Sequence, residues 1–338
     1  MQAWGIFEPM SDTLRVALVG GGNIAQHHLE VLKDLPGVEV FALADADPQV
    51  LRETAERFSI PQRWPSHRDL LERERPDAVF VLVSVMNVAA VATAFIREGI
   101  PTFLEKPPGL YAAHTRRLAE LAGQRHTLAM VGVNRRFYSV LLRGRELLRE
   151  SGPVRSVTIE AHEDLARVRS NPKWPEEVAR RWSAANGIHA LDLLRFFGGE
   201  VAQVQALHRA VEGPGPDCCA ALISFAQGAV GRALMDHFAP GGHRLEVRTR
   251  GATLTSEQGF SAATFQRRGA GPLRLEPDEL DQRYKPGFFR QDRAFVEGAR
   301  HNAPLPFPAC DLEDAAKTME LIETIAGTAG EAPAFPEA

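Results

Sequence analysis

A glycine-rich loop directly after the first apolar run places the strongest constraint on this chain. Residues 14–19 (LRVALV) indicate a buried strand, and residues 20–25 (GGGNIA) follow at once and begin a helical pattern. The loop matches G-x-G-x-x-A, in which Gly20 makes the tight turn, Gly22 lets a phosphate approach the backbone, and Ala25 lets helix and strand pack closely. The amides and dipole of a helix N-terminus favour phosphate groups. The pattern therefore predicts a dinucleotide-binding βαβ unit.

An acidic residue ends the next predicted strand, residues 38–44. Asp45 follows the loop by about 20 residues, the spacing expected of a carboxylate that accepts a hydrogen bond from ribose. The alternative is that Asp45 only helps to start the following helix, but Asp47, directly before Pro48, is better placed as the N-cap. A carboxylate at position 45 repels a 2′-phosphate, and Ala46 offers no cation to bind one. We therefore expect NAD as the cofactor, with NADP disfavoured.

Short apolar runs continue to alternate with helical patterns through residue 134. This alternation predicts a doubly wound parallel sheet with helices on both faces, and ligands at the carboxyl ends of its strands. Residues 78–96 form an apolar run near the length of a bilayer span, but 79–83 is typical of a buried strand and Ser84 and Asn87 interrupt the run. We expect no membrane segment.

Composition narrows the class of protein further. The 338 residues are 44% apolar with a net charge of −4, which suggests two globular domains and argues against nucleic acid as a partner. Three cysteines, two of them adjacent, indicate neither a disulfide framework nor a zinc site, so we expect no metal and a cytoplasmic location. Residues 1–12 lack the pattern of a secretory signal, and Met10 is a plausible alternative start.

The pattern changes after Asn134. Residues 138–150 indicate a helix, and strand-like runs then follow one another at 154–162, 201–210, 218–225, 229–237, 245–250 and 252–255. Strands without intervening helices predict an antiparallel-rich sheet in an α+β domain. We therefore expect a nucleotide-binding domain at 1–134 and an α+β substrate and oligomerisation domain at 135–338. Residues 295–329 indicate two helices joined by a proline-rich link, and we assign them to packing.

A lysine follows the predicted strand 102–104, in the turn Glu105-Lys106-Pro107-Pro108. At a carboxyl end of the sheet, its ammonium would face the cofactor crevice, where it could hydrogen-bond a substrate hydroxyl and take part in proton transfer. Neighbouring charge or burial would tune its pKa. Without further motifs, the alternative interpretation is that Lys106 is an ordinary surface lysine in a proline-rich turn.

These features together resemble the glucose–fructose oxidoreductase/inositol dehydrogenase/rhizopine-catabolism (Gfo/Idh/MocA) family. The resemblance rests on the glycine loop, Asp45, the Glu105-Lys106-Pro107 turn and the later Gly187-Ile188-His189-x-x-Asp192. It covers nearly the whole chain, from Leu14 to about Gly330. It implies a Rossmann domain followed by an α+β domain with a large open sheet that is commonly used for oligomerisation. It also implies an NAD(P)-dependent dehydrogenase or reductase acting on sugars, sugar derivatives or cyclitols.

The resemblance assigns a proton-handling role to His189, which is predicted to lie on the helix 186–197 beside Lys106. A structural histidine is the alternative. The family's aspartate falls on Ala185, which transfers no proton, and its neighbour Asn186 offers an amide that is neither acid nor base. Lys106 and His189 could suffice, or Glu163 or Asp164 could replace the missing carboxylate.

Residues 164–182 are predicted to be a loop-rich stretch in which cations alternate with tryptophans. Such a stretch suits an anionic or glycan substrate, with Arg180 pairing and Trp182 stacking on a sugar face. The alternative, a solvated loop with an aromatic anchor, stays open. Asn134 and Arg136 resemble the family's segment near the nicotinamide, although Arg136 could equally form a hinge salt bridge.

The sequence thus predicts an NAD-dependent oxidoreductase that transfers hydride between nicotinamide and a secondary alcohol or ketone of a sugar, sugar acid or cyclitol, working as a homodimer or homotetramer. Expected cofactor contacts are Gly20, Gly22, Asn23, Ile24, Ala25, Asp45, Ser84, Glu105, Lys106, Asn134 and Arg136. Expected catalytic residues are Lys106 and His189, and expected substrate contacts are Lys106, Asn186, His189, Arg180 and Trp182. The alternatives are a non-catalytic NAD-binding sensor and a redox-neutral glycoside-cleaving enzyme with tightly bound NAD.

Overall fold

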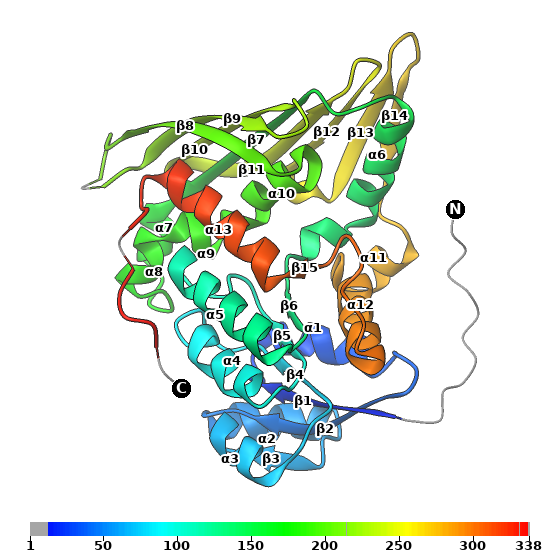
Figure 1. Cartoon of the computed structure of the whole chain (residues 1–338), viewed down its shortest axis with the longest axis vertical. Helices are drawn as coiled ribbons and strands as arrows, with labels where there is room; N and C mark the ends of the chain where they lie inside the picture. Colours follow the sequence, from blue (N-terminus) through cyan, green and yellow to red (C-terminus); the bar gives the residue numbers. More distant parts are fainter. Residues whose placement is uncertain (1–12, 214, 331, 337–338) are drawn as a thin grey trace.

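The structure is a computed structural model that describes residues 13–213, 215–330 and 332–336, and it contains two β-sheets (Figure 1). The first sheet has seven strands in the order β15-β6-β5-β4-β1-β2-β3. Its strands are β1 (Leu14–Val19), β2 (Val38–Ala44), β3 (Gln62–Trp64), β4 (Ala78–Val81), β5 (Thr102–Leu104), β6 (Ala129–Val131) and β15 (Cys310–Asp311). All pairs are parallel except β15 with β6. The predicted doubly wound Rossmann sheet is confirmed.

Helices cover both faces of this sheet. They are α1 (Asn23–Leu32), α2 (Pro48–Arg57), α3 (His67–Arg73), α4 (Val88–Arg97) and α5 (Ala112–Arg125). The α1 helix packs with the later helix α12 (Phe288–His301) on one face, and α3 and α4 pack on the other. Asp47 accepts hydrogen bonds from the first turn of α2, and Ser66 does so for α3. Asp47 is therefore the N-cap that the sequence predicts, which leaves Asp45 available for another role.

The second sheet has eight strands in the order β14-β13-β12-β11-β7-β10-β9-β8, and only the β7–β10 pair is parallel. Its strands are β7 (Ser156–Asp164), β8 (Val201–Arg209), β9 (Cys218–Phe225), β10 (Val230–Asp236), β11 (Phe238–Arg248), β12 (Ala252–Glu257), β13 (Ala262–Arg267) and β14 (Pro272–Leu275). Along β9 and β10, buried and more exposed residues alternate. One face of the sheet is therefore a core face and the other is solvent-facing.

The core face packs on helices that lie between the two sheets (Figure 1). These are α6 (Ser139–Glu150), α10 (Ile188–Gly198) and α13 (Leu312–Ala326), and the short helix η1 (Asn134–Phe137) precedes α6. The opposite face of the sheet carries no helix in Figure 1. This arrangement matches the expected α+β half with a large open sheet.

Two stretches differ from the sequence prediction. Residues 164–182 are not mainly loop but contain α7 (Leu165–Arg169) and α8 (Glu176–Arg180), and α9 (Trp182–Ala185) follows. Helices of four or five residues are too short to show a periodic apolar pattern, so they could not be predicted from the sequence. In the C-terminal stretch, α12 begins at Phe288 rather than near Phe295, and the link contains β15. The structure also has η2 (Gln258–Phe260) and α11 (Glu279–Arg283).

The C-terminal part of the chain returns to the first sheet. Helix α12 covers the face that α1 also covers, and β15 adds an antiparallel edge strand to β6. The division at residues 134 and 135 stays a prediction, and it assigns α12 and β15 to the second domain although both pack on the first. Residues 1–12, with the proposed alternative start at Met10, lie outside the described residues.

The described residues contain neither a membrane-spanning helix nor a cluster of metal-ligating side chains. No helix among them combines the length and the apolar character that crossing a membrane requires. Nor do they contain a group of three or more His, Cys, Asp or Glu side chains placed to hold a metal ion.

Candidate active site

The glycine loop has the geometry that close approach of a phosphate requires. Gly20 has a φ of +98°, and a methyl group added to it would lie 2.6 Å from the carbonyl oxygen of Leu82. A methyl group on Gly22, by contrast, would meet no atom within 4 Å. Gly20 is thus required by the turn, and Gly22 leaves open space at the N-terminus of α1, where the first helical amides have no intrahelical partner. Asn23 and Ile24 begin that helix, and Ala25 is buried against the sheet.

Asp45 lies beside this loop at the end of β2. Its carboxylate accepts a hydrogen bond of 2.7 Å from the Gly21 amide and one of 2.8 Å from the Asp47 amide. The side chain is part-exposed, so it can also accept from a bound ribose. Ser84, at the carboxyl end of β4, is exposed, and its carbonyl oxygen accepts the amides of Asn87 and Val88 at the start of α4.

Lys106 connects the turn after β5 to the second half of the chain. Its Nζ atom donates a 3.0 Å hydrogen bond to the carbonyl oxygen of Ala185 at the end of α9. Burial lowers the pKa of Lys106 to about 8, and the positive charges of Arg135 and Lys285 act in the same direction. Near pH 8 this lysine is therefore present in both protonation states, as a proton-transferring group requires.

Glu105 is held from the opposite side by a buried histidine that sequence reasoning missed. His28, on α1, places Nδ1 2.8 Å from Asp292 of α12 and Nε2 3.5 Å from Glu105. Burial alone would lower the pKa of His28, but the two carboxylates outweigh it and raise that pKa to about 9. No sequence signal could have found this contact, because Asp292 lies more than 260 residues from His28 along the chain.

His189 lies in the first turn of α10, close enough to Lys106 for their charges to interact. Burial lowers the pKa of His189 well below its usual value, and the charges of Lys106 and Arg135 lower it further. The imidazole is therefore neutral at pH 7. Its Nδ1 atom is buried without a hydrogen-bond partner among the described residues. An unpartnered buried nitrogen of this kind can hydrogen-bond a bound molecule.

Asn186 and Glu163 also belong to this cluster. Asn186 Nδ2 donates a 2.6 Å hydrogen bond to Oε1 of Glu163 on β7, and the Nε2 atom of His243 lies 2.9 Å from the same oxygen. Burial alone would raise the pKa of Glu163, but His243, Trp182 and Asn186 together reverse that effect and leave the pKa below its usual value. A carboxylate thus lies near Lys106, although position 185 itself contributes only a backbone carbonyl.

Asn134 and Arg136 are engaged in contacts within the protein. Asn134 Nδ2 donates to the carbonyl oxygen of Pro286 at 3.1 Å. Arg136 is buried, pairs with both oxygens of Asp192 at 2.6 Å, and contacts Asp314 of α13 at 2.5 Å. This is the salt-bridge alternative that the sequence left open for Arg136, and it joins η1 to α10 and α13. Contact of these two residues with a cofactor stays a prediction.

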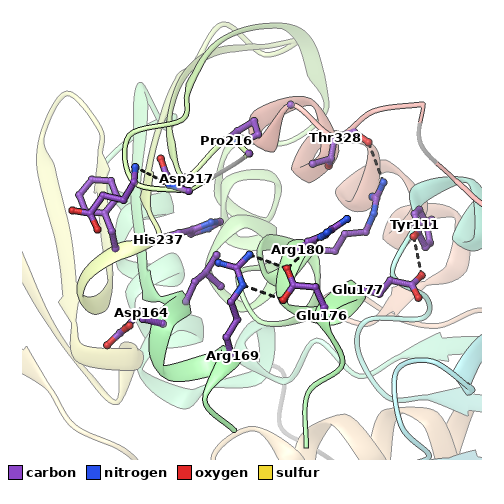
Figure 2. A pocket seen from close by; sticks show the side chains of 18 residues that line it. Tyr111, Asp164, Arg169, Glu176, Glu177, Arg180, Pro216, Asp217, His237 and Thr328 are labelled. Carbon is purple, nitrogen blue, oxygen red and sulfur yellow. Dashed lines mark hydrogen bonds and ion pairs between the residues drawn. The ribbon is translucent and has the colours of Figure 1, made fainter. Parts of the chain in front are cut away.

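The structure does not bring Arg180 to Lys106. Arg180 lines a cavity of about 1040 Å³ bounded by α7, α8 and the segment before β9, and neither Lys106 nor His189 lines it (Figure 2). In that cavity Arg180 and Arg169 both pair with Glu176. Trp182 is buried in an apolar cluster with Leu110, Tyr111, Leu165 and Val178. Substrate contacts by Arg180 and Trp182 therefore stay predictions.

Two family models match this chain. Residues 14–133 match the NAD-binding Rossmann fold of the GFO/IDH/MocA oxidoreductase family, and residues 144–255 match the GFO/IDH/MocA C-terminal domain. Together the two matches cover more than half of the chain. Their division agrees with the two sheets described above.

Several relatives at low identity are dehydrogenases, and another is a glycosyl hydrolase family 109 protein of Shewanella pealeana, 30% identical over 142 residues, which is 38% of this chain and 31% of that protein. The chain is 31% identical over 201 residues to an inositol 2-dehydrogenase of Acidothermus cellulolyticus, which is 58% of this chain and 57% of that protein. It is 25% identical over 195 residues to a D-apiose dehydrogenase of Paraburkholderia graminis, which is 56% of this chain and 51% of that protein. The chain thus spans little more than half the length of these two dehydrogenases.

A solved structure extends the similarity over both sheets. GenD2 from gentamicin A biosynthesis, in complex with NAD, superposes with a TM-score of 0.73 at 25% identity, covering 97% of this chain and 98% of that one. The sequence resemblance, the family models and this structural similarity agree. The chain belongs to the Gfo/Idh/MocA family of oxidoreductases, with an NAD(P)-binding Rossmann domain followed by the family's C-terminal domain.

Proposed function

We propose that this protein is an NAD-dependent dehydrogenase or reductase that interconverts a secondary alcohol and a ketone in a sugar, sugar acid or cyclitol. The observation that carries the proposal is the Lys106 cluster. A lysine with a lowered pKa lies at the carboxyl edge of the Rossmann sheet, beside a neutral histidine with an unpartnered nitrogen. The relatives' names, inositol and apiose dehydrogenases, support the polyol class.

NAD fits the loop that the chain presents. The open space at Gly22 and the helix amides of Asn23 and Ile24 would hold the diphosphate, and the Asp45 carboxylate would accept a ribose hydroxyl. The same carboxylate opposes a 2′-phosphate, which supports NAD over NADP. Ser84 and Glu105 lie at the carboxyl ends of β4 and β5, where the nicotinamide half of such a ligand is expected.

In this proposal, side chains of the protein accept the proton of the substrate hydroxyl. NAD bound here supplies the acceptor for the hydride that leaves the carbinol carbon. As the carbonyl forms, neutral Lys106 takes the hydroxyl proton and becomes an ammonium ion, which the Ala185 carbonyl oxygen stabilises. His189, held neutral, can hydrogen-bond the same substrate oxygen through its unpartnered ring nitrogen. Reduction of a ketone reverses both transfers.

The outer face of the second sheet supports a self-association role. Leu207, Leu222 and Leu234 lie on β8, β9 and β10 and are between 44% and 56% exposed. Apolar side chains clustered on a sheet face without a covering helix are typical of an interface between subunits. We therefore infer a homodimer or homotetramer formed through this face.

Replacement of Lys106 tests the proposed chemistry. Lys106→Met should lower kcat for NADH formation by about two to four orders of magnitude, because it removes the proton acceptor and leaves the glycine loop intact. NAD affinity, followed by quenching of tryptophan fluorescence, should stay within about threefold. The matched control is Lys33→Met, which changes an exposed lysine at the end of α1. A Lys106→Met enzyme that keeps its rate would refute the assignment.

An assay with several classes of substrate separates the alternative functions. The purified protein is analysed for bound nucleotide and assayed with polyols, sugar acids and glycosides. NADH formation with a polyol supports the dehydrogenase. Glycoside cleavage with no net NADH, by protein that retains NAD, indicates the redox-neutral enzyme. Tight NAD binding with no turnover of any substrate indicates the non-catalytic NAD-binding sensor.

A further inference from the structure

Four side chains form a hydrogen-bonded chain along one side of the Lys106 cluster. Arg135 NH1 lies 2.8 Å from His243 Nδ1, His243 Nε2 lies 2.9 Å from Glu163 Oε1, and Asn186 Nδ2 lies 2.6 Å from the same Oε1. The guanidinium of Arg135 also stacks over the ring of Phe260 at 4.7 Å. The four residues come from η1, β11, β7 and the turn before α10, so only the tertiary fold brings them together.

The partners determine which ring nitrogen of His243 carries the proton. A guanidinium only donates hydrogen bonds, so Nδ1 must accept from Arg135. A carboxylate only accepts, so Nε2 must carry the proton that it donates to Glu163. His243 is therefore a neutral imidazole in one tautomer. Its contact with Arg135 fixes the ring so that Nε2 donates to Glu163.

The same argument orients the amide of Asn186. Because Glu163 only accepts, the Asn186 nitrogen must face it, and the amide oxygen Oδ1 is left on the other side. No described residue donates a hydrogen bond to that oxygen, and the Asn186 side chain is part-exposed. Asn186 directly follows Ala185, whose carbonyl oxygen binds Lys106. The amide oxygen is thus an oriented acceptor on the residue that follows the lysine's backbone partner.

We propose that Arg135, His243 and Glu163 are positioning residues that lock Asn186 as a hydrogen-bond acceptor for a second substrate hydroxyl, next to the reacting carbon. This inference rests on the proposed dehydrogenase function and narrows its substrate class to vicinal diols. A substrate with hydrogen in place of that hydroxyl leaves the amide oxygen unpaired and is rejected.

Substitutions of Glu163 separate geometry from charge. Both hydrogen bonds end on Oε1, so Glu163→Gln can keep both acceptor contacts while it removes the charge. Glu163→Ala removes both contacts and frees the Asn186 amide to rotate. The matched control is Glu160→Ala, on the same strand, where the carboxylate instead contacts His162 and Arg244.

The kinetic test uses a cyclitol that supports NADH formation and its mono-deoxy analogues that lack a hydroxyl next to the reacting carbon. We expect Glu163→Ala and Asn186→Ala each to lower kcat/KM for the diol by about tenfold or more, with no further loss in the double variant, because they act as one unit. Glu163→Gln should keep the preference for the diol over the deoxy analogue, because it keeps both acceptor contacts. Both alanine variants should lose the preference for the diol over the deoxy analogue. A preference unchanged in both variants would overturn the proposal.

A second measurement needs no substrate. In ¹⁵N-histidine-labelled protein, with the His243 signals assigned by comparison with His243→Gln, we expect a neutral imidazole protonated at Nε2 at pH 7, and mixed tautomers in Arg135→Gln. A doubly protonated His243, or one protonated at Nδ1, would disprove the hydrogen-bonded arrangement of Arg135, His243, Glu163 and Asn186, whether or not the protein turns over a substrate. Absence of turnover in the unmodified protein would count against the proposed function. The tautomer of His243 would still decide whether the four side chains are hydrogen-bonded as described.

Discussion

At the scale of single residues, Lys106 shows how the fold changes the chemistry of a side chain. An exposed lysine is protonated at neutral pH, but burial at the edge of the first sheet lowers the pKa of Lys106 to about 8. Glu105 and Glu163 act against that shift, and Arg135 and Lys285 act with it. The neighbouring His189 is kept neutral by burial and by these same cations. The lysine is thus the group in the cluster suited to exchange a proton.

A pH profile tests this assignment. Oxidation of an alcohol requires neutral Lys106, so kcat/KM should rise with pH through an inflection near 8 and level off above it. Reduction of the ketone requires the ammonium form and should show the opposite limb. Initial rates in both directions between pH 6 and 10 provide the measurement, with buffers of matched ionic strength. A flat oxidation profile across that range would count against Lys106 as the base.

At the scale of elements, His28 ties α1 to α12 and to the turn that carries Lys106. The ring lies between Asp292 and Glu105 and contacts the rings of Phe80, Phe103 and Phe288. Because the folded pKa of about 9 exceeds the unfolded value of 6.5, protonated His28 stabilises the fold fully below pH 6.5. That stabilisation is lost as the pH rises toward 9.

Replacement of His28 should therefore destabilise the protein in a pH-dependent way. His28→Gln should lower the free energy of unfolding by on the order of 3 kcal/mol near pH 6, and the deficit should shrink as the pH approaches 9.5. Calorimetric Tm values of both proteins between pH 6 and 9.5 measure this. His301→Gln, at the exposed end of α12, is the control. A deficit that does not vary with pH would show that His28 contributes by packing alone.

At the scale of the whole molecule, the open sheet has an outer face with exposed leucines that no helix covers in Figure 1. Leu222→Glu would place a charge among the exposed leucines, on β9 between β8 and β10. We expect light scattering after gel filtration to show a dimer or tetramer for the unmodified protein and a smaller species for the variant. Val211→Glu, outside the strands, should keep the oligomer. A monomeric unmodified protein would disprove the interface.

Short motifs were enough to predict the nucleotide-binding half of the protein. Gly20, Gly22, Asp45 and the Asp47 cap act through local backbone geometry, so short-range patterns were sufficient to predict both the loop and the alternation of strands and helices. The Lys106 turn and His189 could be named for the same reason, since each stands in a short motif. The short helices α7 to α9 could not, because they span about one turn each.

The tertiary structure alone decided what surrounds the motifs. The carboxylate near Lys106 is Glu163, two strands and several helices away from the turn, and Arg136 pairs with Asp192 and Asp314. His28 meets Asp292 across nearly the whole chain. Such pairings join residues that are distant in sequence, and pKa values follow from burial and charge in three dimensions. Motif spacing therefore named the candidate catalytic residues, while the fold set their protonation states and their partners.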